Sequence, residues 1–325
     1  MTENYEVLVI GGGAAGLSGG LMLARARRSV LVVDGGEPRN APADGVHALL
    51  GHDGVPPAEL LARGRDEVRR YGGHLTEGRV ETVDRDGDGF AVALADGRRV
   101  RAGHVLVATG LVDELPDVPG LRERWGRDVV HCPYCHGWEV RERPIGVIGS
   151  GPMSVHQTLL FRQWSDDVVY LRHTAPPLTE EQAEQLAARG VPVVEGEIAA
   201  VETAGDRLTG VRLRDGRTVD REVLTVAPRM VARAAFLAGL GLRPQPHPSG
   251  MGEYLPADES GRTDVPGVWV AGNVTNLSAQ VGAAAAAGAW TAAMINADLV
   301  QAETQRAVEA HRGARAGGWV TTNHP

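Results

Sequence analysis

The strongest constraint on the fold of this 325-residue chain is a glycine-rich turn near its N-terminus. The apolar run Tyr5–Ile10 predicts a β-strand, the turn Gly11-Gly12-Gly13-Ala14-Ala15-Gly16 follows, and an Ala/Leu-rich run to about Arg27 predicts a helix. In such a G-x-G-x-x-G turn the first glycine permits the tight bend, the second lets a pyrophosphate approach the backbone, and the third allows close helix–strand packing. A second predicted strand, Val30–Val33, ends on Asp34, where an acid can bind ribose hydroxyls. The pattern predicts a dinucleotide site.

The same plan recurs later in the chain. A second glycine turn, Gly149-Ser150-Gly151, follows the predicted strand Pro144–Ile148. Each copy is followed by Asp/Gly turns typical of an antiparallel ribbon, at Asp86–Gly89 and Asp96-Gly97 in the first copy and at Gly205-Asp206 and Asp215-Gly216 in the second. The sequence therefore predicts an α/β protein with two Rossmann-like, three-layer domains.

Two Pro-rich segments, Leu115–Gly120 and Arg243–Gly250, mark the crossings between these copies. The apolar motif Val265–Val274 comes after the second crossing but belongs with the first copy. We therefore expect a discontinuous FAD-binding domain, residues 1–116 and 246–325, with a second domain, residues 117–245, inserted into it.

The late motif also favours a flavin. A strand ending on Gly272-Asn273 can hydrogen-bond the ribityl chain, and Gln280-Val281 then opens a predicted Ala-rich helix over Leu277–Leu299. The positive end of that helix can stabilise a reduced, anionic flavin. Together with the first glycine turn, this motif predicts FAD as the cofactor.

Composition narrows the possible partners. The net charge of −8 argues against nucleic acid or an anionic membrane surface. No apolar run approaches the length of a membrane span, and no basic segment precedes the N-terminal apolar run, so we expect a cytoplasmic protein. The chain has no lysine, so phosphate contacts must come from arginine, backbone N–H groups or helix ends.

The only two cysteines lie three residues apart, in His131-Cys132-Pro133-Tyr134-Cys135-His136-Gly137. A C-x-x-C pair closes a small disulfide ring and lowers the pKa of one thiol, which suits thiol–disulfide exchange. Covalent haem, a zinc site and a purely structural pair are the alternatives. Haem attachment normally accompanies export, and four adjacent ligands cannot easily surround one tetrahedral ion. Because the flavin motifs supply an electron acceptor, we favour redox chemistry and expect no metal.

The order of these motifs, with Thr109-Gly110 after the strand His104–Ala108, resembles the low-molecular-weight thioredoxin reductase family over nearly the whole chain. The resemblance implies that Cys135 faces the flavin and that Cys132 exchanges with the substrate. It also implies a homodimer. The FAD contacts that it implies are Gly11, Gly13, Ala14, Ala15, Gly16, Asp34, Gly272, Asn273, Gln280 and Val281, with Arg39, Asn40, Val80 and Gly110 assigned by position alone.

Departures from that family indicate the direction of electron flow. His136 stands where the reductases have an acidic proton donor, and only Arg172 remains of the arginine cluster that binds the 2′-phosphate of NADPH. The Cys-x-x-Cys-His pattern is similar to that of the gliotoxin- and holomycin-type flavin dithiol oxidases. We therefore expect an FAD-dependent oxidase that forms a disulfide in a small-molecule dithiol, with His136 as base and molecular oxygen reduced to hydrogen peroxide. An NAD(P)H- or ferredoxin-dependent disulfide reductase is the principal alternative, and a flavin-binding regulatory protein without turnover is another.

Overall fold

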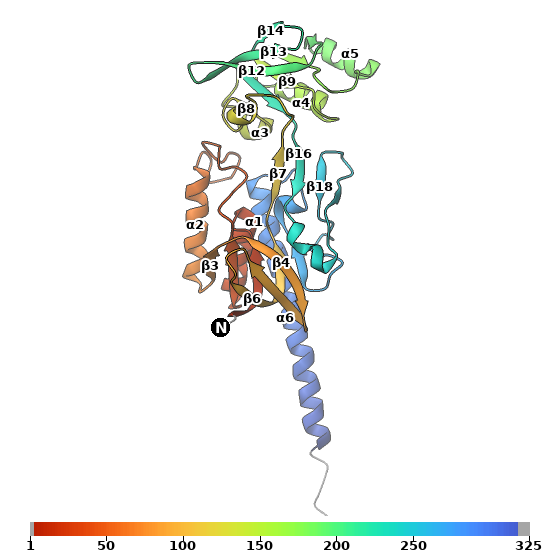
Figure 1. Cartoon of the computed structure of the whole chain (residues 1–325). Coiled ribbons are helices and arrows are strands. Elements are labelled where there is room, and N and C mark those ends of the chain that lie inside the picture. The colour runs from red at the N-terminus through yellow and green to blue at the C-terminus, as the bar shows by residue number, and fades with distance from the viewer. Residues whose placement is uncertain (1–2, 318–325) are drawn as a thin grey trace, which may run out of the picture.

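A computed structural model describes residues 3–317 of the chain, with side chains up to residue 314. The first region is built on a seven-stranded sheet in the order β3-β2-β1-β6-β5-β4, in which β19 also pairs with β6 (Figure 1). Strands β3, β2, β1, β6 and β19 are parallel, whereas β4 and β5 form an antiparallel ribbon. The bounds are β1 Glu3–Ile10, β2 Val30–Asp34, β3 His74–Glu77, β4 Val80–Asp86, β5 Gly89–Leu94, β6 Arg99–Val107 and β19 Val268–Val270.

Both faces of this sheet are covered, because alternate residues of its central strands are buried on opposite sides. On one face Val7 and Val9 pack with residues of three helices, α1 (Ala14–Arg25), α2 (Pro57–Arg70) and α6 (Val281–Gly317). On the other face Leu8 and Ile10 pack with the β4–β5 ribbon and with the 3-10 helix η2 (Ala235–Leu240). The result is the predicted three-layer arrangement.

The second region repeats the plan around a five-stranded parallel sheet in the order β11-β10-β9-β15-β8, accompanied by a three-stranded antiparallel sheet. Strands β9 and β15 are buried along their whole length, as expected of parallel strands covered on both sides. The strands are β8 Val129–Val130, β9 Ile145–Ile148, β10 Val168–Leu171, β11 Val193–Val194, β12 Ile198–Ala204, β13 Arg207–Leu213, β14 Thr218–Asp220 and β15 Val223–Val226. The helices are η1 Arg122–Arg124, α3 Pro133–His136, α4 Ser154–Phe161 and α5 Glu180–Ala188.

Two antiparallel strands, β7 (Leu111–Glu114) and β16 (Arg229–Ala232), run between the regions (Figure 1). They share a small sheet with β17 (Gln245–Pro246) and β18 (Gly252–Tyr254), and the 3-10 helix η3 spans Gly272–Val274. After β16 the chain already belongs to the first core, because Ala234 and Leu237 are buried there. This packing places the return crossing near Arg229, earlier than the expected residue 246.

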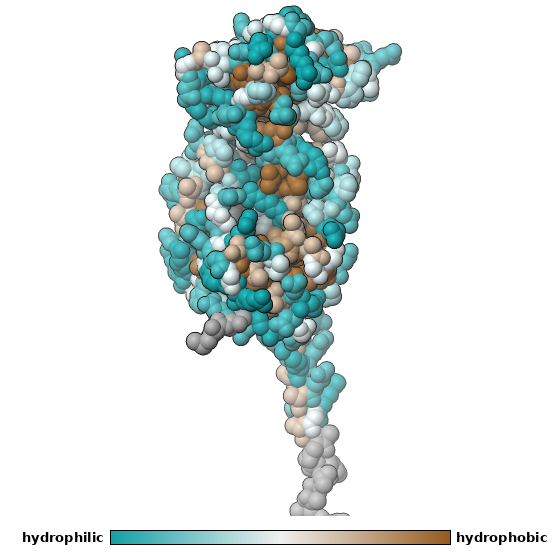
Figure 2. Space-filling view, viewed as in Figure 1, coloured by the Kyte–Doolittle hydropathy of each residue, from teal (hydrophilic) through white to brown (hydrophobic). Residues whose placement is uncertain are grey.

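Helix α6 is longer than the predicted Leu277–Leu299. It begins at Val281, packs along α1 and projects from the molecule as far as Gly317 (Figure 1). Residues 301–314 are exposed, and Figure 2 shows the projecting part covered mostly by hydrophilic residues. Contrary to the expectation from sequence, one 18-residue window of α6 has a mean hydropathy of 1.2, so by length and composition alone the helix could cross a membrane. Its buried residues, among them Ala292 and Ile295, instead pack in the core of the first region.

Candidate functional site

A cavity of about 1600 Å³ lies between the two regions and brings together motifs that are far apart in sequence. Its walls come from the first glycine turn, the end of β2, the loop after β2, strands β7 and β16, the C-x-x-C segment and the start of α6. The predicted residues that line it are Gly11, Gly13, Ala14, Ala15, Asp34, Arg39, Asn40, Val80, Gly110, Cys132, Cys135, His136, Asn273, Gln280 and Val281. Gly16 and Gly272 do not line it.

The first glycine turn is shaped to receive a phosphate group. Gly11 has a φ of +112°, in the region that favours glycine, and a Cβ at Gly13 would meet no atom within 4 Å. Within residues 3–314 no side chain caps the N-terminus of α1, so the N–H groups of its first turn can bind an anion. Gly16 acts behind this surface, because an added Cβ there would overlap the carbonyl oxygen of Gly11.

Asp34 lies beside the glycine turn at the end of β2. An added Cβ at Gly12 would overlap its carboxylate. One carboxylate oxygen accepts a hydrogen bond from the Gly36 backbone at 3.0 Å, and the other lies 3.1 Å from the Arg65 guanidinium. These contacts fix the carboxylate next to the open turn, so Gly13 and Asp34 together fit the pyrophosphate and ribose of a dinucleotide.

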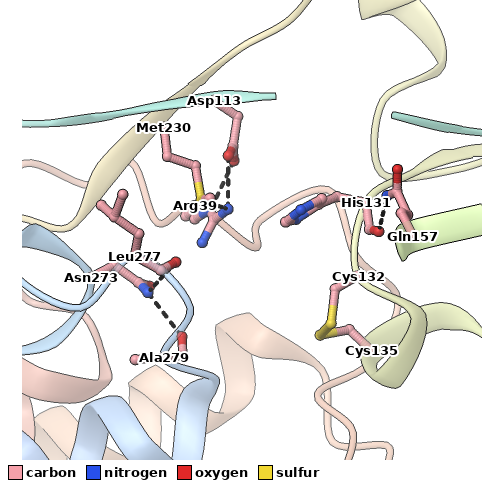
Figure 3. The surroundings of a disulfide bond; sticks show 10 residues. All are labelled: Arg39, Asp113, His131, Cys132, Cys135, Gln157, Met230, Asn273, Leu277 and Ala279. Carbon is pink, nitrogen blue, oxygen red and sulfur yellow. Dashed lines mark hydrogen bonds and ion pairs between the residues drawn. A yellow bond between two sulfur atoms is a disulfide. The ribbon is translucent and has the colours of Figure 1, made fainter. Parts of the chain in front are cut away.

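Two other predicted cofactor residues have protein partners. Arg39 forms a bidentate ion pair with Asp113 of β7, with N–O distances of 2.7 and 2.8 Å (Figure 3). The Asn273 amide nitrogen donates to the carbonyl oxygens of Asn276 at 3.0 Å and Ala279 at 2.9 Å. Asn273 therefore shapes the loop that leads into α6, and Gly272 packs behind it against Ala15.

The two cysteines form a disulfide at the start of α3, with their Cα atoms 5.2 Å apart. Cys132 is the residue before the helix and Pro133 is its first residue, a position that proline favours because its φ is already helical. The backbone N–H groups of Cys135 and His136 both donate to the carbonyl oxygen of Cys132, at 3.2 and 3.1 Å. Both cysteines line the cavity.

His136 has two buried ring nitrogens, and neither has a hydrogen-bond partner among the residues that the structure describes. Burial lowers the pKa of His136, although the nearby Glu139 carboxylate acts in the opposite direction. A neutral imidazole with an open nitrogen can accept a proton from a thiol that enters the cavity.

His131 also belongs to the site, although no sequence motif assigns it a role. Its imidazole lines the cavity and is directed toward the Arg39–Asp113 pair, while its carbonyl oxygen accepts a 2.6 Å hydrogen bond from Gln157 (Figure 3). Burial and the positive charge of Arg39 lower the pKa of His131 to about 4. Its place directly before Cys132 was the only signal available from the sequence.

The second glycine turn is arranged differently. The hydroxyl of Ser154 accepts hydrogen bonds from the backbone N–H groups of Ser150 and Gly151, at 3.1 and 3.2 Å. The Ala175 N–H donates to the carbonyl oxygen of Gly149, so the segment after β10 folds back over the turn. Arg172, the remaining arginine of the expected phosphate cluster, forms an ion pair with Glu195. Two backbone N–H groups of the second turn and the arginine that follows β10 are thus paired within the chain itself.

Comparison with known proteins agrees with this architecture. The model of the pyridine nucleotide-disulphide oxidoreductase family matches residues 5–292. The thioredoxin reductase tcpT of Claviceps purpurea is 30% identical over 90% of this chain and 95% of its own length. The crystal structure of HlmI is 44% identical with a TM-score of 0.90, covering 97% of this chain and 99% of that one. An oxidoreductase from Agrobacterium tumefaciens is 36% identical with a TM-score of 0.86, over 92% of this chain and 99% of its own.

The matched family typically binds FAD, and the redox-active C-x-x-C of this chain lies in the cavity where its motifs meet. The chain therefore belongs to the pyridine nucleotide-disulphide oxidoreductases and is a flavin-dependent thiol/disulfide oxidoreductase of the low-molecular-weight thioredoxin reductase type.

Proposed function

We propose that this protein is an FAD-dependent dithiol oxidase that forms a disulfide in a small sulfur-containing metabolite. It acts as a cytoplasmic homodimer and uses molecular oxygen as the final acceptor. The observation that carries the proposal is the second glycine turn, where Ser154 occupies the backbone donors that a nicotinamide dinucleotide would need. The Cys132-x-x-Cys135-His136 pattern supports it, because an oxidase needs a base where a reductase needs an acid.

The residues of the site support the following sequence of steps. His136 takes a proton from one substrate thiol, and the thiolate attacks the sulfur of Cys132, so that a mixed disulfide forms and Cys135 leaves as a thiolate. The second substrate thiol attacks the substrate sulfur of the mixed disulfide, and its proton goes to the Cys132 sulfur that leaves. The substrate disulfide leaves, and Cys132 and Cys135 are both reduced. When bound, FAD supplies an acceptor for these two electrons, which oxygen then takes with two protons to give hydrogen peroxide.

The alternative is an NAD(P)H-dependent disulfide reductase, and the names of several relatives favour it. Those from Claviceps purpurea and Leptosphaeria maculans are called thioredoxin reductases. The two functions differ in which reductant reaches the flavin first.

Anaerobic mixing of the purified protein tests the proposal. We expect a small dithiol such as dithiothreitol to bleach the flavin absorbance rapidly, NADPH and NADH to bleach it slowly or not at all, and admission of oxygen to restore it with one hydrogen peroxide per dithiol. Full bleaching within seconds by micromolar NADPH would assign the reductase function instead.

A further inference from the structure

The loop between β2 and α2 carries a histidine, His47, that reaches the C-x-x-C segment. The loop is closed on itself by backbone hydrogen bonds at 2.8 Å, from Val46 N–H to Val55 and from Gly54 N–H to Val46. Val46 is buried, and the Asp53 carboxylate accepts from the Ala48 N–H at 2.9 Å. The backbone on both sides of His47 is therefore fixed.

The side chain of His47 joins the two regions. Its Nε2 lies 3.5 Å from Glu139 Oε1 in the second region, and its Nδ1 lies 3.6 Å from Asp53 Oδ1 in its own loop. Glu139 follows His136 by three residues, on the turn where the Val140 N–H donates to the His136 carbonyl oxygen at 3.2 Å. Val140, the residue next to Glu139, is buried. A contact made by Glu139 therefore restrains the segment that carries the disulfide.

No hydrogen bond fixes the imidazole of His136, since both of its ring nitrogens lack a partner within residues 3–314. The charged groups that affect it are His47, Glu139 and Asp44. His47 in turn faces Glu139 and Asp53. The His47–Glu139 contact thus links the first region to the segment that bears His136.

We propose that His47 and Glu139 are positioning residues, whose ion pair holds the Cys132–Cys135 segment and His136 against the cavity in the orientation needed for electron transfer to the flavin. This proposal rests on the proposed function only in requiring that the dithiol delivers its electrons to a flavin in that cavity.

The test compares His47→Gln, Glu139→Gln and the double variant with wild type, using dithiothreitol as reductant in anaerobic stopped-flow. Each single variant should slow the limiting rate of flavin bleaching about fivefold, while the FAD content and the dithiothreitol concentration that gives half of that rate stay unchanged. The double variant should be no slower than either single variant, because the two residues act as one unit. Glu142→Gln is the matched control, since Glu142 is exposed and has no ion-pair partner within residues 3–314.

A second measurement does not depend on turnover. Hydrogen–deuterium exchange of the peptide spanning residues 131–141 should become faster in both single variants and stay unchanged in Glu142→Gln. Additive slowing in the double variant or unchanged exchange of residues 131–141 would overturn the proposed role of the His47–Glu139 contact. If dithiothreitol does not reduce the wild-type flavin, the proposed oxidase function fails, and the exchange measurement still decides the role of His47 and Glu139.

Discussion

The two glycine turns stand at equivalent places in the two regions, yet only one is prepared to bind a ligand. Each follows a buried parallel strand and leads into a helix, β1 into α1 and β9 into α4. Within residues 3–314 neither helix has a side-chain cap at its N-terminus. Asp34 lies at the end of the strand that follows the first turn. At the second turn the buried hydroxyl of Ser154 takes two backbone N–H groups.

The difference shows how a dinucleotide-binding fold can lose the ability to bind its ligand while the path of its backbone stays the same. Buried backbone donors must be paired, either with a bound phosphate or with the protein itself. In the second region the hydroxyl of Ser154 is the protein partner of two such donors. The Arg172 guanidinium, which could otherwise bind a phosphate, is likewise paired, with the Glu195 carboxylate. One region can therefore hold a cofactor, while the other serves to carry the disulfide.

The same substitution in both turns should produce the largest contrast. Gly13 and Gly151 both have open space where a Cβ would stand, so glutamate fits at either position. In Gly13→Glu the new carboxylate meets the pyrophosphate of FAD. Two like charges about 4 Å apart near a protein surface repel by about 4 kcal/mol, so we expect FAD to bind at least about 100-fold more weakly.

Gly151→Glu should keep its FAD content and its rate of dithiol oxidation. Flavin absorbance per protein after gel filtration measures the first quantity for both variants. Equal flavin loss in the two variants would show that the two turns do not differ in their ability to bind FAD.

The cysteines connect the two regions, and their variants should abolish turnover while retaining flavin. In Cys132→Ser the remaining Cys135 thiolate should lie beside the flavin and give a long-wavelength charge-transfer band. In Cys135→Ser the remaining Cys132 should give none. Absorbance spectra of the two variants above the flavin bands make this comparison, and a band that follows Cys132 would reverse the two roles.

His136→Ala should slow flavin reduction by a small dithiol by about two to four powers of ten, the usual contribution of a general base. Since burial lowers the pKa of His136, the imidazole is neutral and able to accept a proton at neutral pH. The loss should shrink as pH rises toward the thiol pKa, because the substrate then ionises without help. His156→Ala, which removes an exposed histidine of α4, is the control. A near-wild-type rate for His136→Ala at pH 7 would dismiss the base role.

Ser154→Ala should have the smallest effect and act on stability. It leaves the N–H groups of Ser150 and Gly151 without their acceptor, so the free energy of unfolding should fall by about 1 kcal/mol. FAD content should not change, and NADPH should still fail to bleach the flavin, because the Ala175 backbone still folds over the turn. Denaturant titration and anaerobic mixing check the two outcomes, and rapid bleaching by NADPH would mean that Ser154 alone closes the site.

The elements of the two sheets could be predicted because local patterns determine them. Strands such as β2 and β10 are short apolar runs with β-branched residues, and the ribbons are bounded by Asp/Gly turns. The end of α6 could not be predicted, because its apolar pattern fades near Leu299 while good helix formers continue into an exposed segment. The return crossing lies earlier than the Pro-rich segment Arg243–Gly250 indicates, because only long-range packing assigns Ala234 and Leu237 to the first core.

The reactive residues of the site could be predicted from the sequence, since Cys132, Cys135 and His136 lie within five consecutive positions. Their surroundings could not be predicted. The Arg39–Asp113 pair, which faces His131, joins residues 74 positions apart. The contact between His47 and Glu139 joins residues of different regions. Ser154 stood within a recognised motif, but the bonds made by its hydroxyl depend on the backbone path of the turn.

The central claim is that the first turn binds a dinucleotide and the second does not, and calorimetric titration of the purified, FAD-loaded protein with NADPH tests it most directly. We expect no binding heat up to millimolar NADPH, while the flavin-free protein titrated with FAD gives one site per chain. A micromolar dissociation constant for NADPH, lost in Gly151→Glu, would contradict the account and show that the second turn is an open nucleotide site.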